Sequence, residues 1–170
     1  MNFRKLEEKD VDGMLEWMND SEIYENFRFS SESRSKENVL NFIREAVIEP
    51  IDGKSIHFAI VDENDDYLGT ISLKDINIVD KNAEFAIVLR KKAQAKGIGT
   101  ESIKRMLDLA FNKFKLERVY LNVFSENNKA IRLYEKCGFT YEGEFRKHIF
   151  LRGEYRSLKW FSVLREDFKN

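Results

Sequence analysis

A helix-forming stretch between two strand-like runs most constrains the fold of this chain. Apolar residues recur there at offsets of 0, 3, 4, 7, 8 and 11, and they are Ile103, Met106, Leu107, Ala110, Phe111 and Phe114. This spacing places them on one face of an amphipathic helix. The flanking runs, 83–89 and 118–124, have the apolar, β-forming composition of strands. A strand-helix-strand unit predicts two parallel strands with the helix packed on their sheet.

The other segments predict further strands and helices around this unit. Helical spacing recurs in Val11, Met14, Leu15 and Met18, and again over 39–47 after a capping Ser35. A last helix is expected over 128–137, and strands near 2–6, 56–61, 67–73, 139–150 and 154–164. We therefore expect an α/β (α+β) fold with a mixed, mostly antiparallel central sheet of about six to seven strands, flanked on both faces by about four helices. The chain has 170 residues and no linker-like segment, which predicts a single domain over 1–170.

Charge and composition exclude several classes of protein. The 29 Lys and Arg residues are balanced by 30 Asp and Glu residues, whereas a nucleic-acid-binding protein usually has a basic excess. No apolar stretch is long enough to span a membrane, and the start of the chain lacks the apolar segment of a secretory leader. Cys137 is the single cysteine, so neither a disulfide nor a Cys/His zinc set is expected. We expect a cytoplasmic protein with no metal, no membrane contact and no nucleic acid partner, in which Cys137 is a structural thiol.

The loop over 90–100 joins the strand at 83–89 to the regular helix. Four of its side chains are basic, and Gly97 and Gly99 stand at the start of the helix. Glycines let the backbone approach a ligand, and the free N–H groups of a helix N-terminus attract phosphate oxygens. A solvated loop whose glycines only shape a turn explains the same residues equally well. The spacing fits neither a P-loop, because Thr100 rather than lysine follows Gly99, nor a dinucleotide site, because no acidic residue ends the next strand.

Two motifs resemble those of the GNAT superfamily of acetyl-CoA-dependent N-acetyltransferases. Residues 94–99 are similar to the family's Gln/Arg-x-x-Gly-x-Gly/Ala signature, and residues 128–139 are similar to its Asn-x-x-Ala-x-x-x-Tyr-x-x-x-Gly-Phe helix. The order of elements matches the family along nearly the whole chain. Within the superfamily the chain most resembles the branch of spermidine N-acetyltransferases and ribosomal-protein N-terminal acetyltransferases, on residues 17–20, 83–85 and 153–156.

The resemblance implies acetyl-CoA as the co-substrate and assigns residues to its binding. In the family the strand before the signature parts from its neighbour, and the pantetheine arm bonds to the exposed backbone, here that of Ile87 and Leu89. The pyrophosphate binds N–H groups of the signature loop, which here comprises Gln94, Ala95, Lys96, Gly97, Ile98, Gly99 and Thr100. Asn128 and Lys136 are candidate contacts of the CoA arm, with a helix cap and a solvent-facing cation as their alternatives.

Acetyl transfer to an amine poses two proton problems. The amine, with a pKa of about 10.4, must lose a proton before it attacks, and the CoA sulfur gains from a proton donor as it leaves. By resemblance Tyr134 is that acid, and Glu84 is the general base, directly or through water. The alternatives are a tyrosine that fills the inner face of its helix and a structural carboxylate. The resemblance implies direct transfer without a covalent enzyme intermediate.

In the family the acceptor pocket is formed by the loop between the first two helices and by the last hairpin, which correspond here to residues 21–34 and 150–156. Candidate contacts are Tyr24, Phe27, Arg28 and Glu154. A small primary amine of polyamine, amino-sugar or amino-acid type fits this aromatic lining of mixed charge, although its arginines weaken the case for a polyamine. A protein N-terminus as the acceptor, a non-catalytic CoA-binding module and an RNA-associated protein are the alternatives.

The resemblance also implies a homodimer or a larger homo-oligomer. Trp160 and Phe161, in the last strand-like run, are a conceivable contact surface, although core packing is the favoured use of both side chains. His57 lies in another strand-like run, where a core or rim position is favoured over a catalytic role.

Overall fold

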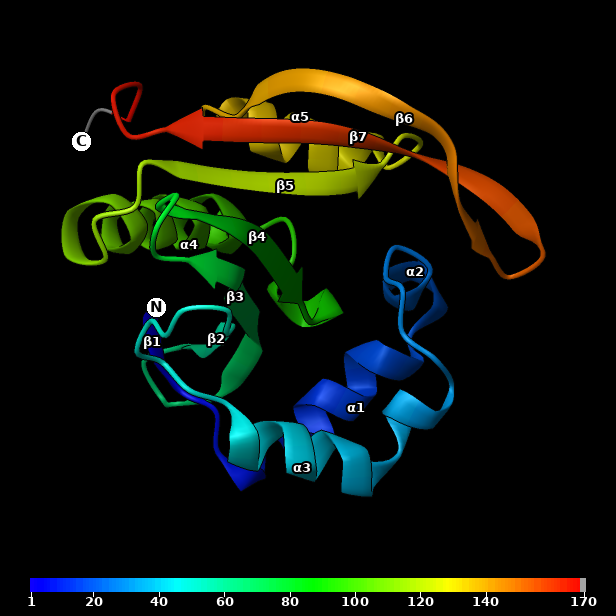
Figure 1. Ribbon diagram of the computed structural model, residues 1–170. Helices are drawn as coiled ribbons and strands as arrows, with labels where there is room; N and C mark the ends of the chain where they lie inside the picture. Colours follow the sequence, from blue (N-terminus) through cyan, green and yellow to red (C-terminus); the bar gives the residue numbers. More distant parts are fainter. Residues whose placement is uncertain (169–170) are drawn as a thin grey trace.

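The computed structural model describes residues 1–168 and contains one seven-stranded sheet (Figure 1). The strands are β1 (Asn2–Lys5), β2 (Ile56–Val61), β3 (Tyr67–Asn77), β4 (Asn82–Leu89), β5 (Arg118–Phe124), β6 (Thr140–Leu151) and β7 (Glu154–Leu164). Their order is β1-β2-β3-β4-β5-β7-β6, and neighbouring strands are antiparallel except for β4 and β5. The predicted mixed, mostly antiparallel sheet with a parallel step is therefore confirmed.

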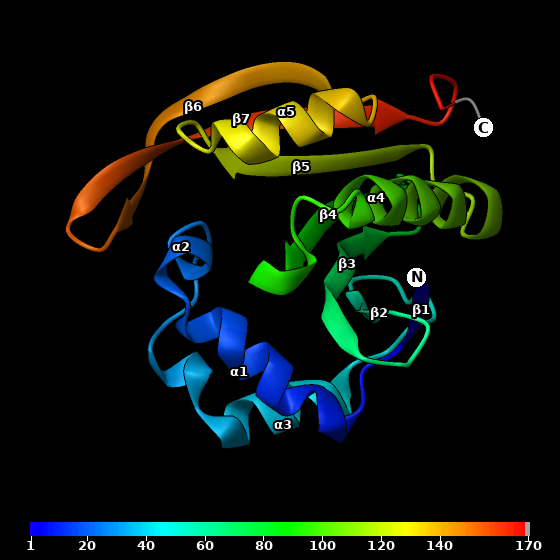
Figure 2. The same ribbon diagram turned by 180° about the vertical axis from the view of Figure 1, so that it is seen from behind.

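Five α-helices of the described chain cover the two faces of the sheet (Figures 1 and 2). One face carries α1 (Val11–Asn19), α2 (Ser21–Tyr24) and α3 (Lys36–Glu45), and the other carries α4 (Ile98–Asp108) and α5 (Asn128–Lys136). The sequence does not predict α2, because one helical turn is too short to show apolar periodicity. Ser35 caps α3 as expected, since its side chain accepts a hydrogen bond from the Asn38 N–H. Within residues 1–168 no helix is long and apolar enough to cross a membrane.

Two helices end differently from what their apolar spacing predicts. α3 stops at Glu45, because Ala46 is extended and Val47 pairs with β2, where the His57 N–H donates to the Val47 carbonyl at 3.0 Å. The helix predicted over 103–114 changes from α4 to a π-helical turn at Leu109–Lys113. Backbone pairing and local turn geometry therefore set these ends, and apolar periodicity does not report them.

Two hydrophobic cores, one on each face of the sheet, hold the helices in place. Successive residues of β2 show the division, because their side chains alternate between the faces. Phe58 and Ile60 pack in the core that contains α4 and α5, whereas Ala59 and Val61 pack in the core that contains α1 and α3. The helices on both faces that the sequence predicts are thus confirmed.

Exposed aromatic side chains gather on the last two strands, but Trp160 and Phe161 are not among them. Phe161 is buried in the core, and Trp160 packs against Tyr120 and Phe145. The exposed aromatics of this region are Tyr141, Phe145, Phe150 and Tyr155. β6 is an edge strand of the sheet, and most of its residues are exposed. Core packing is therefore confirmed for Phe161, and the oligomeric state stays a prediction.

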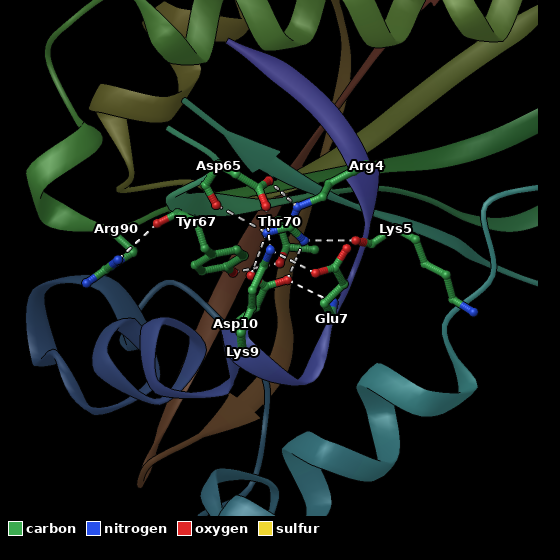
Figure 3. A network of polar contacts seen from close by, with 9 residues as sticks. All are labelled: Arg4, Lys5, Glu7, Lys9, Asp10, Asp65, Tyr67, Thr70 and Arg90. Atoms are coloured by element: carbon green, nitrogen blue, oxygen red, sulfur yellow. Dashed lines mark hydrogen bonds and ion pairs between the residues drawn. The ribbon is translucent and has the colours of Figure 1, made fainter. Parts of the chain in front are cut away.

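A buried ion pair fixes the start of the chain against the sheet (Figure 3). Arg4 donates two hydrogen bonds to Asp10, at 2.8 and 2.9 Å. Asp10 is only 1% exposed and also accepts from the Glu7 N–H at 2.9 Å. Arg4 reaches Asp65 as well, at 2.6 Å, in the turn between β2 and β3. Because Asp10 directly precedes α1, this pair links β1 to the start of that helix.

A second set of polar contacts joins α1 to β3 and to the loop that follows β4. The Trp17 Nε1–H donates to the Tyr67 hydroxyl at 3.1 Å, and that hydroxyl lies 2.7 Å from Thr70 Oγ1. Burial raises the pKa of Tyr67 to about 12, so its hydroxyl stays protonated. Arg90 donates to the Tyr67 carbonyl at 2.9 Å and pairs with Glu16 of α1. Arg90 is therefore an anchor for the loop, and it is not free to bind a phosphate.

β4 and β5 pair over a short length and then separate. The parallel register joins residues 82–84 to residues 118–120. Beyond it, residues 85–89 of β4 pair with β3 alone, and residues 121–124 of β5 pair with β7 alone. Figure 2 shows the two ribbons diverging toward the C-terminal end of β4. The sheet is therefore open along one edge of β4 at its centre, as the resemblance implies.

Candidate active site

A cavity of about 1170 Å³ lies where β4 and β5 part. Its lining comes from both faces of the sheet: from α1, α3 and the chain between them on one face, and from the start of α4 and from α5 on the other. Ordinary ligand pockets have volumes of about 300–1,000 Å³. The cavity therefore has room for two reactants that meet at the parting strands.

The loop before α4 has the backbone geometry of an anion site. Ala95 and Gly97 are both left-handed, with φ of 59° and 80°, and α4 begins directly after Gly97. The free N–H groups and the positive dipole end of the helix favour an anion at this position. Five of the seven loop residues predicted to bind CoA line the cavity, namely Gln94, Ala95, Gly97, Gly99 and Thr100. Lys96 and Ile98 are not part of the lining.

Gly99 and Gln94 join the start of α4 to β4 and α5. A Cβ at Gly99 would lie 3.3 Å from Leu133 Cδ2 and 3.5 Å from Leu89 Cδ1, so the glycine permits a close approach. The Gln94 amide donates to the Leu89 carbonyl at 3.0 Å and accepts from Lys129 Nζ at 2.7 Å. Ile87 and Leu89 both line the cavity as predicted. The Leu89 carbonyl, however, is already hydrogen-bonded by Gln94 and is not an unpaired group.

α5 brings Tyr134 to the cavity and leaves two other predicted residues outside. Asn127 caps the helix, because its side chain accepts from the Ala130 N–H at 3.2 Å. The alternative of a cap for Asn128 is therefore wrong by one residue. Asn128 and Lys136 are exposed and do not line the cavity, whereas Asn127 and Ala130 do. Helical spacing explains the difference, since only the face that carries Tyr134 points inward.

The Tyr134 side chain is buried between aromatic neighbours, with its hydroxyl group at the cavity. Its ring lies 6.3 Å from the ring of Phe85 and 5.8 Å from that of Phe139. Within residues 1–168 no group hydrogen-bonds its hydroxyl, and the role of Tyr134 as the acid stays a prediction. Burial raises the pKa of Tyr134 to about 12, and the phenol is therefore protonated at neutral pH.

Glu84 is the last residue of β4 that pairs with β5, and the two strands begin to part there. Lys74 Nζ lies 2.7 Å from its Oε1, and the Asn122 amide donates to the same oxygen at 3.1 Å. All three side chains line the cavity. Because both contacts end on Oε1, the carboxylate is fixed in orientation and Oε2 is left to accept from an incoming group.

An aromatic wall lines the cavity on the side of α1. Trp17, Phe27 and Phe29 form it, with ring centroids 5.6, 5.9 and 6.3 Å apart. Arg28 lies beside this wall and donates to the Asn122 side-chain carbonyl at 3.3 Å. Phe27 and Arg28 thus lie where an acceptor site is predicted. Residues 17–20 contribute to the resemblance to the branch, but the sequence predicts no acceptor contact for Trp17 or Asn122, because the two lie on separate elements far apart in the chain.

Tyr24 and Glu154, which are predicted to contact the acceptor, do not line this cavity. The Tyr24 ring packs with the guanidinium groups of Arg34 and Arg152, at 5.0 and 4.9 Å. Glu154 lies in a separate hollow of about 440 Å³ beside the last hairpin. Both residues lie outside the cavity because the tip of the hairpin supports the chain at 24–27 from outside. Their contact with an acceptor stays a prediction.

His57 also lines the acceptor half of the cavity. Its Nδ1 lies 2.7 Å from Ser72 Oγ, and its ring packs against the edge of Phe42 at 4.7 Å. Burial, assisted by the charge of Lys74, lowers the pKa of His57 to about 4. The imidazole is therefore neutral near pH 7 and adds no charge to the cavity.

We expect a His57→Gln variant to lose less stability in acid than the wild-type protein. In the unfolded chain His57 takes up a proton near pH 6.5, but in the folded protein it does so only near pH 4. Folding free energy is therefore lost as the pH falls through this interval, by about 2–3 kcal/mol from this one group. Urea unfolding of both proteins at pH 7 and pH 4 measures the difference. Equal losses in the two proteins would contradict the lowered pKa.

The cavity unites a helix N-terminus, an open strand edge and a buried phenol. A CoA thioester requires an anchor for its diphosphate, a slot for an extended arm and a hydrogen-bond donor near its sulfur. The fold and the cavity together therefore define an acyltransferase that uses a CoA thioester.

The family described as "Acetyltransferase (GNAT) domain" matches residues 1–140. The chain belongs to this family and is an N-acetyltransferase that uses acetyl-CoA. A spermidine N(1)-acetyltransferase of Vibrio cholerae serotype O1 is 32% identical over 155 residues, which cover 84% of this chain and 90% of that protein. The putative ribosomal N-acetyltransferase YdaF of Bacillus subtilis is 29% identical over 101 residues, which cover 59% of this chain and 55% of that protein.

A solved structure of similar fold holds a CoA molecule. The crystal structure of spermidine N-acetyltransferase from Vibrio cholerae in complex with CoA and spermine has a TM-score of 0.86 and 29% sequence identity. The alignment covers 98% of this chain and 96% of that one. The predicted family, branch and fold are thus confirmed. Since the two named relatives differ in their acceptors, family membership alone does not fix the acceptor of this chain.

Proposed function

We propose that this chain transfers the acetyl group of acetyl-CoA directly to the primary amine of a small molecule. One continuous cavity carries the proposal, because it joins the start of α4 and Tyr134 on one face of the sheet to Glu84 and the aromatic wall on the other. The spermidine acetyltransferase relatives support a polyamine as the acceptor, and an amino sugar or an amino acid also fits the lining. We further propose that the whole chain, 1–170, forms a single domain of this kind.

The donor half of the cavity is formed by small residues and backbone groups. The residues that would hold acetyl-CoA are Ile87, Leu89, Gln94, Ala95, Gly97, Gly99 and Thr100. Their N–H groups at the start of α4 take the diphosphate, and the open edge of β4 takes the extended arm. When bound, acetyl-CoA supplies an activated acetyl group at the place where the two halves of the cavity meet.

Tyr134 and Glu84 move the protons of the reaction in this proposal. Glu84 Oε2 takes a proton from the acceptor's ammonium group, directly or through one water molecule. The freed nitrogen then bonds to the acetyl carbon, the carbon–sulfur bond breaks, and its electron pair goes to sulfur. Tyr134 gives its proton to that sulfur, which leaves as a thiol. The nitrogen becomes positively charged as it bonds and loses its second proton to solvent, which yields the neutral amide. Glu84 releases the first proton to solvent, and Tyr134 regains one from solvent, so that one proton is released in each turnover. No bond to the enzyme forms at any stage.

A thiol-release assay with a panel of amines tests this function. We expect acetyl-CoA to be consumed with at least one polyamine, amino sugar or amino acid. CoA at 100 times its Kd should also raise the free energy of unfolding by about 2.7 kcal/mol. Stabilisation by CoA without turnover of any amine would indicate a non-catalytic CoA-binding module instead, and turnover with peptides alone would indicate a protein N-terminus as the acceptor.

A further inference from the structure

The carboxylates that line the cavity are already paired with lysines. Lys91 Nζ lies 2.9 Å from Glu22 Oε2, and Lys74 Nζ lies 2.7 Å from Glu84 Oε1. Within residues 1–168 no other acidic side chain lines the cavity. A polyamine carries several ammonium groups, and each one needs a carboxylate or another strong acceptor when it leaves water. Glu22 is 72% exposed and stays in water, and Glu84 serves the reacting nitrogen. The buried part of the lining therefore provides no further carboxylate for a second ammonium group.

Arg28 is the cation of the acceptor half that has no carboxylate partner in the described part of the chain. Its hydrogen bond to Asn122 Oδ1, at 3.3 Å, is to a neutral amide. Lys74 is paired with Glu84, and Lys129 lies at the donor end of the cavity. A guanidinium group binds a carboxylate through two parallel N–H groups. The acceptor half thus has an unpaired positive charge that suits an acidic group on the ligand.

Asn122 links Arg28 to the proposed general base. Its amide oxygen accepts from Arg28 at 3.3 Å, and its amide nitrogen donates to Glu84 at 3.1 Å. Its place on β5 is fixed by its pairing with Trp160 of β7. A single amide side chain therefore separates a guanidinium group from a carboxylate. This spacing suits a molecule that carries an amine and an acid group close together.

The last hairpin holds the segment that carries Arg28. Arg152 donates to the carbonyls of Tyr24 and Phe27, both at 3.3 Å, and Arg156 donates to the carbonyl of residue 25 at 3.1 Å. The backbone just before Arg28 is therefore held in place by these three hydrogen bonds.

The rest of the acceptor half is apolar. The wall of Trp17, Phe27 and Phe29 continues in a ring of further side chains, which are Met14, Met18, Ile23, Val39 and Phe42. An apolar group gains about 25 cal/mol for each Å² that it buries against such a surface. This part of the cavity therefore favours a hydrocarbon or aromatic group over a charged chain.

We propose that the acceptor is an amino acid with an apolar or aromatic side chain, whose carboxylate pairs with Arg28 while its amine lies at Glu84. The inference rests on the proposed function and names its substrate class. The side chain of the amino acid packs on the wall of Trp17 and Phe27. Arg28 is then the residue that distinguishes an amino acid from an amine without an acid group. The bonds made and broken are those given above, and the product is an N-acetyl amino acid and CoA.

Matched acceptors that differ only in the carboxylate test this inference. The pairs are L-phenylalanine with phenethylamine, and L-leucine with isoamylamine, and spermidine is the polyamine reference. A charge-assisted pair with Arg28 should raise kcat/KM for the amino acid of each pair by about 10- to 150-fold. The kcat/KM for spermidine should be lower than that for either amino acid. Equal use of the two members of each pair, or a preference for spermidine, would overturn the inference.

Variants of two arginines show whether Arg28 is the source of the preference. In Arg28→Met the ratio of kcat/KM between phenylalanine and phenethylamine should fall to about 1, through KM, because no charge is left to bind the carboxylate. Arg28→Lys keeps the positive charge but lacks the two parallel N–H groups of the guanidinium, and it should give an intermediate ratio. Arg34→Met removes a cation that packs on Tyr24 outside the lining, and it should keep the wild-type ratio.

The outcomes separate this inference from the proposed function. Acetylation of amines with the same ratio in Arg28→Met as in the wild type overturns the amino-acid inference and leaves the acetyltransferase function standing. Stabilisation by CoA with no acetylation of any acceptor in the panel overturns both. Because Arg28 is exposed, its replacement is not expected to prevent folding, and urea unfolding of each variant checks this.

Discussion

We expect a Tyr134→Phe variant to turn over at least about 100-fold more slowly than the wild-type enzyme, with nearly the same affinity for CoA. Phenylalanine keeps the ring contacts with Phe85 and Phe139 and removes only the hydroxyl group. The sulfur must then leave without a hydrogen-bond donor, so the loss appears in kcat. Thiol release measures kcat, and a titration of CoA against the protein's thermal unfolding measures affinity.

A Glu84→Gln variant is the matched control, because it removes the other proton step. Its rate should rise steeply as the pH approaches the pKa of the acceptor's amine, about 10.4 for an alkyl amine and lower for an α-amino group, because the acceptor then needs no base. Tyr134→Phe should instead be slower than the wild type by the same factor at every pH. Burial raises the pKa of Tyr134 to about 12, so the wild-type phenol stays protonated throughout the working range. A Tyr134→Phe enzyme with the kcat of the wild type would exclude the donor role.

We expect an Arg4→Met variant to lose about 3–5 kcal/mol of unfolding free energy. Methionine fills much of the space of the arginine stem but leaves the buried Asp10 carboxylate without its cation. The Glu7 N–H, at 2.9 Å, is then the main hydrogen bond left to that carboxylate. Urea denaturation measures the loss as a lower midpoint, with the slope m unchanged if the transition stays two-state.

Two further variants test whether the burial of Asp10 causes the expected loss in Arg4→Met. Lys9→Met removes a cation that pairs with Glu7 and Asp65 but is 52% exposed, so it should cost far less unfolding free energy than Arg4→Met. Asp10→Asn added to Arg4→Met removes the unpaired charge and should recover much of the loss. If Arg4→Met cost no more than Lys9→Met, the pair with Asp10 would be an ordinary surface contact.

The sequence predicts the donor half of the site well because that half is local. The strand, the loop over 90–100 and the helix that follows are consecutive, and glycines placed at a helix start have a direct backbone meaning. Apolar periodicity likewise predicts the helices and their faces. It does not predict α2, which is too short to show a period, or the early end of α3, where Val47 pairs with β2. It also does not predict the π-helical turn, because apolar spacing does not report a local change in backbone hydrogen bonding.

The acceptor half is predicted poorly because its residues come from distant parts of the chain. Trp17, His57, Lys74 and Asn122 lie on four different elements, and the register of the sheet brings them together. A single sequence contains no local pattern for such a set. The direction in which the last hairpin bends is also a tertiary property, and it explains why Glu154 lies outside the cavity.

The short pairing of β4 with β5 also determines what holds the two parts of the sheet together. Within residues 1–168 the parallel contact of residues 82–84 with residues 118–120 joins the strands β1 to β4 to the strands β5 to β7. Beyond it, side-chain packing carries the connection, because Phe85 of β4, Ile103 of α4 and Leu121 of β5 belong to one hydrophobic core. A substitution that opens a void in this core therefore weakens the junction of the two parts as well as the packing of α4.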